Sequence, residues 1–99
     1  MKNPIDWDSI VAIYPMGSLI SGNVVHHAPF GVFVDFGHEV LTGFIERTEF
    51  SDKNESLEIQ ESLFPEIGKK ITGIIVGYGQ HNNELRISAR PSLVERASS

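Results

Sequence analysis

Apolar and polar residues alternate in several short stretches of this chain, and glycine, proline or asparagine separates one stretch from the next. Side chains of a β-strand point to opposite faces in turn, so this alternation predicts strands with one buried and one solvent-facing side. Five strands are expected, at residues 17–27, 32–36, 40–46, 69–78 and 84–88. Gly22 is expected to bulge or bend the long first strand, which then contributes to both sides of a small barrel.

The first residues predict a short helix before the barrel. Asn3 is suited to cap it, Pro4 suits its first position, and Pro15 ends it. Four apolar side chains at spacings of three and four are expected to pack against the barrel: Trp7, Ile10, Val11 and Tyr14.

Strand periodicity fails between residues 47 and 68, where helical turns are expected near 48–52 and 57–63. Five strands with a helical insert between the third and the fourth predict an all-β OB-fold barrel. We expect a single domain over residues 1–99, because a chain of this length has room for one core. The tail after Pro91 is expected to fray or to form a short helix. Apolar residues of the insert are expected to plug one barrel end: Leu57, Ile59, Leu63, Phe64 and Ile67.

Aromatic rings are predicted on the outer surface of the barrel. In the second strand, alternation sends two valines inward and Phe33 outward. Phe30 precedes a glycine at which the backbone can bend, so its ring is expected beside Phe33; a core position for both rings is the alternative. Displayed rings suit the stacking of flat ligands, and the bases of single-stranded nucleic acid are the commonest of these. The third strand is expected to display Phe44 and Glu46, and the fifth Arg86.

The net charge of −5 argues against a general nucleic-acid binder, because Lys and Arg supply most of the affinity for phosphate. The acidity is local, however. Residues 46–66 contain seven acidic and two basic side chains, and the rest of the chain is balanced. This segment is interpreted as a solvated loop or, alternatively, as a surface for a basic protein partner.

The sequence favours neither catalysis nor metal or cofactor binding. It has no cysteine, and His26 and His27 are adjacent on a strand, so their rings point to opposite faces. No nucleophile elbow or phosphate loop is found. No apolar run approaches the roughly 18 residues of a membrane span, and the first eight residues do not resemble a signal peptide. A cytoplasmic protein without a membrane partner is therefore expected.

Five collinear segments resemble the S1-type RNA-binding domain, a family named for the ribosomal protein in which it repeats. They are GSLISGNV, FGVFVDF, GFIERTEF, IGKKITGIIV and LRISAR, and the similarity covers about residues 16–90. The resemblance implies a five-stranded OB barrel that holds RNA with two aromatic rings around a glycine, which match Phe30 and Phe33. It also implies an arginine contact, which matches Arg86.

Two positions depart from the pattern of the family. Glu46 stands where the family has a histidine, and Gly79 stands where it has an aspartate. A carboxylate repels each nearby phosphate by roughly 1 kcal/mol in water, which offsets part of the stacking energy of about 1 to 3 kcal/mol per base. We therefore expect weak RNA binding.

The leading prediction is a non-catalytic module that stacks single-stranded RNA and is associated with ribosomes or messenger RNA. Arg86 is expected to contact phosphate or a base, or alternatively to form an ion pair with Glu46 or Glu84. Further bases expected to guide the RNA backbone are Lys69 and Lys70, with Arg47 and Arg90 in support. The alternative is a protein-interaction module, in which the acidic segment with Phe44 and Phe50 docks a basic partner.

Overall fold

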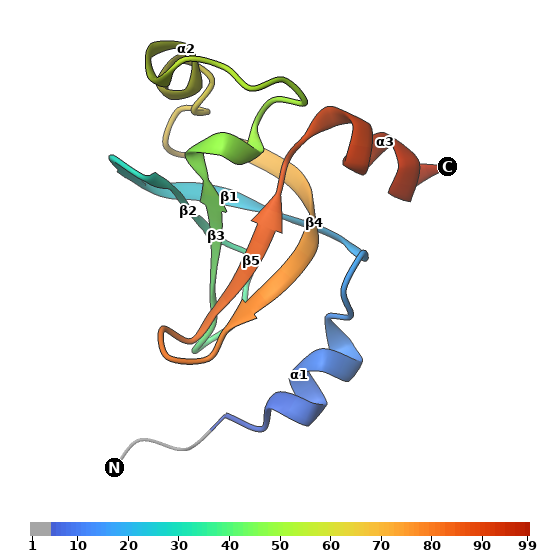
Figure 1. Cartoon of the computed structure of the whole chain (residues 1–99). Coiled ribbons are helices and arrows are strands. Elements are labelled where there is room, and N and C mark those ends of the chain that lie inside the picture. Colours follow the sequence, from blue (N-terminus) through green and yellow to red (C-terminus); the bar gives the residue numbers. More distant parts are fainter. Residues whose placement is uncertain (1–4) are drawn as a thin grey trace.

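The five strands close into a barrel in the computed structural model, which describes residues 5–99 (Figure 1). Around the barrel the strand order is β1-β2-β3-β5-β4. All neighbouring strands are antiparallel except β3 and β5, which are parallel. The expected OB-type architecture is confirmed. The strands are β1 (Leu19–Ala28), β2 (Gly31–Asp35), β3 (Thr42–Glu46), β4 (Lys70–Gly79) and β5 (Glu84–Ser88).

Strand β1 serves both sides of the barrel, as expected from its length. Its first half pairs with β4 and its second half with β2. The bulge lies between Val24 and His26 rather than at Gly22, which corrects the prediction. Gly22 is needed for a different reason, since a Cβ there would lie 2.5 Å from the carbonyl oxygen of Asp35.

The core consists of aliphatic residues from all five strands, together with Ile10 of the N-terminal helix and Leu41, which precedes β3. The alternation of β2 holds, because Val32 and Val34 are buried and Phe33 lies on the other face. Burial of such side chains contributes about 1.5 to 3 kcal/mol each, so the barrel interior dominates the stability of the fold. The buried cluster contains Ile10, Val24, Val32, Val34, Leu41, Ile45, Ile75, Leu85 and Ile87.

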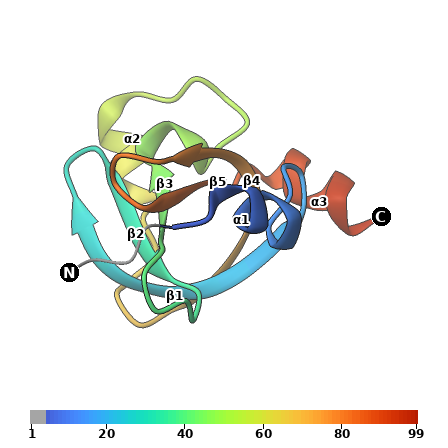
Figure 2. The ribbon, with the colours of Figure 1, turned by 90° about the horizontal axis from the view of Figure 1, so that it is seen from below.

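Helix α1 (Trp7–Ile13) lies across one end of the barrel, the lower end in Figure 1 and the near end in Figure 2. Ile10 enters the core, and the ring of Trp7 meets the ring of Tyr78 edge-on. Val11 is 43% exposed, so its predicted place in the packing stripe is wrong.

The described helix begins later than the sequence predicted. Asp6 caps it by accepting a hydrogen bond from the backbone N–H of Ser9. The Ser9 hydroxyl also donates to this carboxylate, which lowers the pKa of Asp6. Asn3 and Pro4, the expected cap and first helical residue, lie outside the described residues.

The insert between β3 and β4 forms the 3₁₀ helix η1 (Arg47–Glu49) and helix α2 (Leu57–Ser62), both near their expected positions. The predicted apolar plug is wrong for all of its members but Phe64, which packs against the core beside Phe50, with ring centroids 5.5 Å apart. Helix α2 itself lies outside the barrel (Figure 1). The plug residues left exposed are Leu57, Ile59, Leu63 and Ile67.

The tail forms helix α3 (Pro91–Ser98), and acidic residues of the insert hold its beginning in place. Arg90 donates two hydrogen bonds to the carboxylate of Glu49, at 3.1 and 3.2 Å. Asp52 accepts from the backbone N–H and the hydroxyl of Ser92. Part of the acidity of residues 46–66 is therefore structural. No helix within residues 5–99 has the length and apolar character needed to cross a bilayer.

Candidate functional site

Three phenylalanines form one aromatic cluster on the outer face of β2 and β3: Phe30, Phe33 and Phe44. Phe33 and Phe44 are direct cross-strand partners with ring centroids 5.0 Å apart. Phe30, in the turn before β2, lies 5.6 Å from Phe44 and 6.4 Å from Phe33. Phe30 is 54% exposed and Phe33 is half-buried, so both rings offer surface to a ligand.

Phe44 points outward as expected, but it is only 6% exposed, which corrects its prediction as a displayed ring. It lies against the other two rings and outside the buried cluster of the barrel interior. Gly31 makes room for it, because a Cβ at that position would lie 2.6 Å from Cζ of Phe44. The glycine is therefore required for space, and not for the backbone bend that the sequence suggested.

Strand register extends this face into a row across four strands. His26 of β1 is opposite Phe33, Phe33 is opposite Phe44, and Phe44 is opposite Arg86 of β5. The ring of exposed His26 is 5.8 Å from that of Phe33. Sequence reasoning missed His26 because the bulge after Val24 changes which side chains of β1 point outward. The row places an imidazole and a guanidinium on either side of the aromatic cluster.

Arg86 forms an ion pair with Glu46, with Nη1 and Oε1 3.3 Å apart. An ion pair with Glu46 was one of the two pairs that the sequence allowed for Arg86. Both side chains are about half exposed, at 46% and 52%. Exposed pairs of this kind contribute about 0 to 1 kcal/mol, so a phosphate can compete for the guanidinium at little cost.

The other predicted bases are distributed unevenly around this face. Arg47 donates from Nε to Gln60 at 3.1 Å and lines a hollow beside Phe30 and Phe44. Arg90 is engaged by Glu49, which makes it a structural residue. Arg47 is therefore the second base near the rings, after Arg86.

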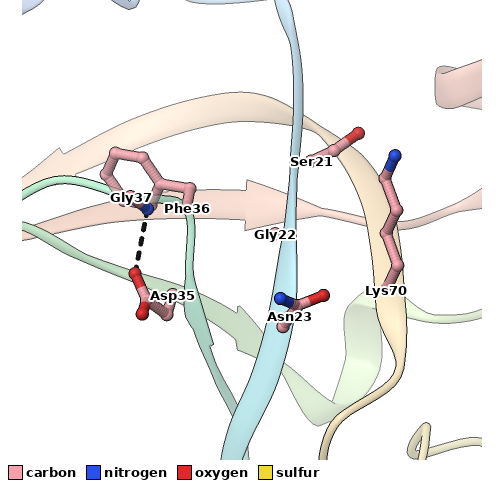
Figure 3. A pocket seen from close by; sticks show the side chains of 7 residues that line it. All are labelled: Ser21, Gly22, Asn23, Asp35, Phe36, Gly37 and Lys70. Carbon is pink, nitrogen blue, oxygen red and sulfur yellow. Dashed lines mark hydrogen bonds between the residues drawn. The ribbon is translucent and has the colours of Figure 1, made fainter.

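Lys69 and Lys70 are not brought to the aromatic cluster. Lys70 is paired with Asn23 in the first half of β1, whereas the cluster lies beside the second half. Figure 3 shows the separate groove of about 510 Å³ that Lys70 lines, with Lys70 and Asp35 on either side of β1. Neither lysine lines any of the three hollows that surround Phe44.

Those three hollows are shallow and share Phe44 as a wall. The first, about 190 Å³, lies over Arg47 and Thr48, and the second, about 200 Å³, lies beside Arg86 and Glu49. The third, about 280 Å³, is called the Glu84 hollow below. Its lining consists of Phe30, Phe33, Thr42, Phe44, Asn82 and Glu84.

Glu84 is the least expected residue of the site, since it is only 7% exposed although it carries a carboxylate. It lies over Gly79 of the neighbouring strand, where an added Cβ would be 2.7 Å from Cγ of Glu84. Gly79 is the position at which the resemblance implied an aspartate, so a carboxylate from β5 occupies space that a side chain on β4 would need. Alternation alone could not reveal this, because the space over Gly79 exists only where β4 and β5 are paired.

Metal coordination has no support in the part of the chain that the structure describes. Within residues 5–99, no three His, Asp or Glu side chains gather closely enough to hold an ion. His27 contacts the carbonyl oxygen of Pro65 through Nε2 at 2.6 Å, and His38 accepts backbone hydrogen bonds from Val40 and Leu41. These two histidines have structural roles.

Comparison with known proteins identifies relatives in the ribosome. The chain is 31% identical over 91 residues to small ribosomal subunit protein bS1 of Chlamydia trachomatis, which covers 92% of this chain and 15% of that protein. It is also 31% identical over 90 residues to bS1 of Chlamydia muridarum, again 15% of its length. The chain thus spans about a seventh of these relatives. No model of a protein family matches it.

Solved structures share the fold at lower identity. GSP13 from Bacillus subtilis superimposes with a TM-score of 0.62 at 16% identity, over 80% of this chain and 58% of that one. A chain of the a/eIF2alpha-aDim2p-rRNA complex from Pyrococcus horikoshii gives 0.66 at 15% identity, over 86% and 49%. These structures agree with the OB-type barrel.

The closed five-stranded barrel defines a protein of the OB-fold class. The similarity to bS1 extends over 92% of this chain, which narrows the class of protein further. The chain is thus similar to a segment of a ribosomal S1 protein, which confirms the resemblance found in the sequence.

Proposed function

We propose that the protein is a non-catalytic module that binds single-stranded RNA on its aromatic cluster. Bases stack on Phe30 and Phe33, while Arg86 and Arg47 contact phosphates. The observation that carries the proposal is the exposed aromatic surface with a guanidinium in the same cross-strand row. Stacking on such rings is worth about 1 to 3 kcal/mol per base and tolerates any sequence.

The charges around the cluster support weak binding. Glu46, Glu49 and Glu84 line the hollows together with only Arg47 and Arg86. Pairing with Arg86 partly offsets the repulsion between Glu46 and phosphate. Stacking then supplies most of the affinity.

Fluorescence anisotropy of a labelled single-stranded RNA at low salt tests the proposal. Phe33→Ala is expected to weaken binding about tenfold, since one stacking contact is lost. Ile59→Ala is the matched control, because it truncates an exposed apolar side chain on α2 and should leave binding unchanged. Absence of binding, or equal binding by both variants and the unaltered chain, would remove this function.

The relatives named as small ribosomal subunit proteins support two further proposals for this chain. It associates with the ribosome or with messenger RNA, and it acts in the cytoplasm. Sedimentation of a cell extract tests the association, because the protein should migrate with ribosomal particles and lose that association when Phe33 is replaced by alanine, and cell fractionation tests the location.

A basic protein partner is the second candidate, and the exposed apolar side chains on and after α2 favour it. Ile59 is 45% exposed and Ile67 is 62% exposed, among acidic residues of the insert. The Phe44 and Phe50 surface first considered for this role is not available, because Phe44 is buried and Phe50 packs against the core. A partner that resists nuclease treatment and is lost with Ile59→Asp would support this candidate.

A further inference from the structure

The Glu84 hollow combines an aromatic wall with an unpaired carboxylate. Phe30, Phe33 and Phe44 form the apolar side of this space of about 280 Å³, and Thr42, Asn82 and Glu84 provide polar groups. Glu84 is more than nine-tenths buried, yet its carboxylate forms no hydrogen bond or ion pair with any residue from 5 to 99.

A carboxylate that keeps only limited contact with water gains from the hydrogen-bond donors that a ligand brings. Another carboxylate on this face, Glu46, already has a cation in Arg86. Within the described chain, every side-chain oxygen that is cut off from solvent has a hydrogen-bond partner, so the unpartnered Glu84 oxygens keep some contact with solvent. A ligand that brings two donors would complete the site.

We propose that Glu84 makes this hollow selective for guanine; the inference rests on the proposed function, because it assumes that RNA bases stack on the aromatic cluster. An ionised carboxylate only accepts hydrogen bonds, and it offers two oxygens side by side. The Watson–Crick edge of guanine carries two adjacent donors, N1–H and the N2 amino group. The two groups therefore form a bidentate, charge-assisted pair.

The other bases do not present this pattern. Adenine and cytosine each place an acceptor nitrogen beside their single amino group, and the N–H of uracil lies between two carbonyl oxygens. Each of them would bring at least one acceptor against the carboxylate of Glu84. A site built for a bidentate hydrogen-bond pair discriminates by about tenfold or more against a base that lacks the donors.

The test measures binding of the intact chain to labelled uridine heptamers that differ in the central base. With guanine at the centre, we expect about tenfold tighter binding than with uracil. Hypoxanthine lacks the N2 amino group, so it should lose most of this gain. Glu84→Gln should bring the guanine-to-uracil affinity ratio close to one, because the amide presents a donor to one of the two guanine donors. Glu58→Gln, an exposed site on α2, is the control and should retain the ratio.

Equal binding of guanine and uracil by the unaltered chain would overturn the inference, and so would a guanine preference that survives in Glu84→Gln. In either case the proposed function stands if Phe33→Ala still weakens the all-uridine RNA. Absence of binding by every RNA would remove both. If Glu84→Gln does not fold, the comparison of guanine with hypoxanthine on the unaltered chain decides, and equal affinity for the two bases counts against Glu84.

Discussion

Phe33 and Phe44 face each other across β2 and β3 with ring centroids 5.0 Å apart, but only Phe33 keeps substantial contact with solvent. The two rings therefore have different roles on the same surface. Phe44 is the apolar base on which the cluster is built, and Phe33 is a ring that a ligand can reach.

This division predicts different effects of the same substitution. Phe44→Ala should lower the free energy of unfolding by about 3 kcal/mol, because it removes a buried ring and leaves a cavity. Phe33→Ala should cost less than half as much stability while it weakens RNA binding more clearly. Urea denaturation of both variants measures the contrast. Equal losses of stability would contradict the assignment of the two roles.

The ion pair between Glu46 and Arg86 predicts a substitution that improves binding. Glu46→Gln removes a carboxylate from the RNA face and releases the guanidinium, so affinity should rise about threefold. Stability should change by less than about 1 kcal/mol, since the pair is exposed. RNA titration and thermal unfolding provide the two measurements. A fall in affinity would mean that Glu46 contacts the ligand directly.

The small number of bases near the rings predicts a weak dependence on salt. If Arg47 and Arg86 contact one phosphate each, the slope of log affinity against log salt is about −1.4, at about −0.7 per contact for single strands. Affinity should then fall only about sevenfold over a fourfold rise in salt. Anisotropy titrations at several salt concentrations measure the slope. A slope twice as steep would require bases beyond these two, such as Lys69 and Lys70.

The space filled by Phe44 predicts that Gly31→Ala is strongly destabilising. The new Cβ would meet the Phe44 ring and the carbonyl oxygen of Ile45, and the backbone atom cannot move aside easily. We expect a loss of about 2 kcal/mol. Gly77→Ala is the control, because its nearest neighbours are side-chain atoms of Arg86 at 3.6 and 3.7 Å. Calorimetry measures the unfolding temperatures of both variants. Equal unfolding temperatures would contradict the close packing at Gly31.

The barrel and much of the candidate site could be predicted from the sequence, because strand alternation fixes which side chains face outward. Phe33, Phe44 and Arg86 were all assigned to the outer face on that basis, and register then brings them together in one row. The near-complete burial of Phe44 was not foreseen, because it depends on how Phe30 and Phe33 lie against it.

The parts that failed depend on contacts between distant segments. The apolar residues of α2 resemble a plug in the sequence, but they stay exposed, whereas Phe50 and Phe64 pack against the core. Lys70 is basic and close to a strand, yet the pairing of β4 with the first half of β1 separates it from the rings. The burial of Glu84 could not be predicted, because it depends on a position beside Gly79 of the neighbouring strand.

Chemical-shift mapping with a short single-stranded RNA would locate the binding surface residue by residue. We expect the perturbed amides to cluster on the outer face of β2 and β3 and around Arg86, with side-chain shifts at Phe30 and Phe33. Perturbations confined to α2, or none at all at saturating RNA, would contradict this expectation.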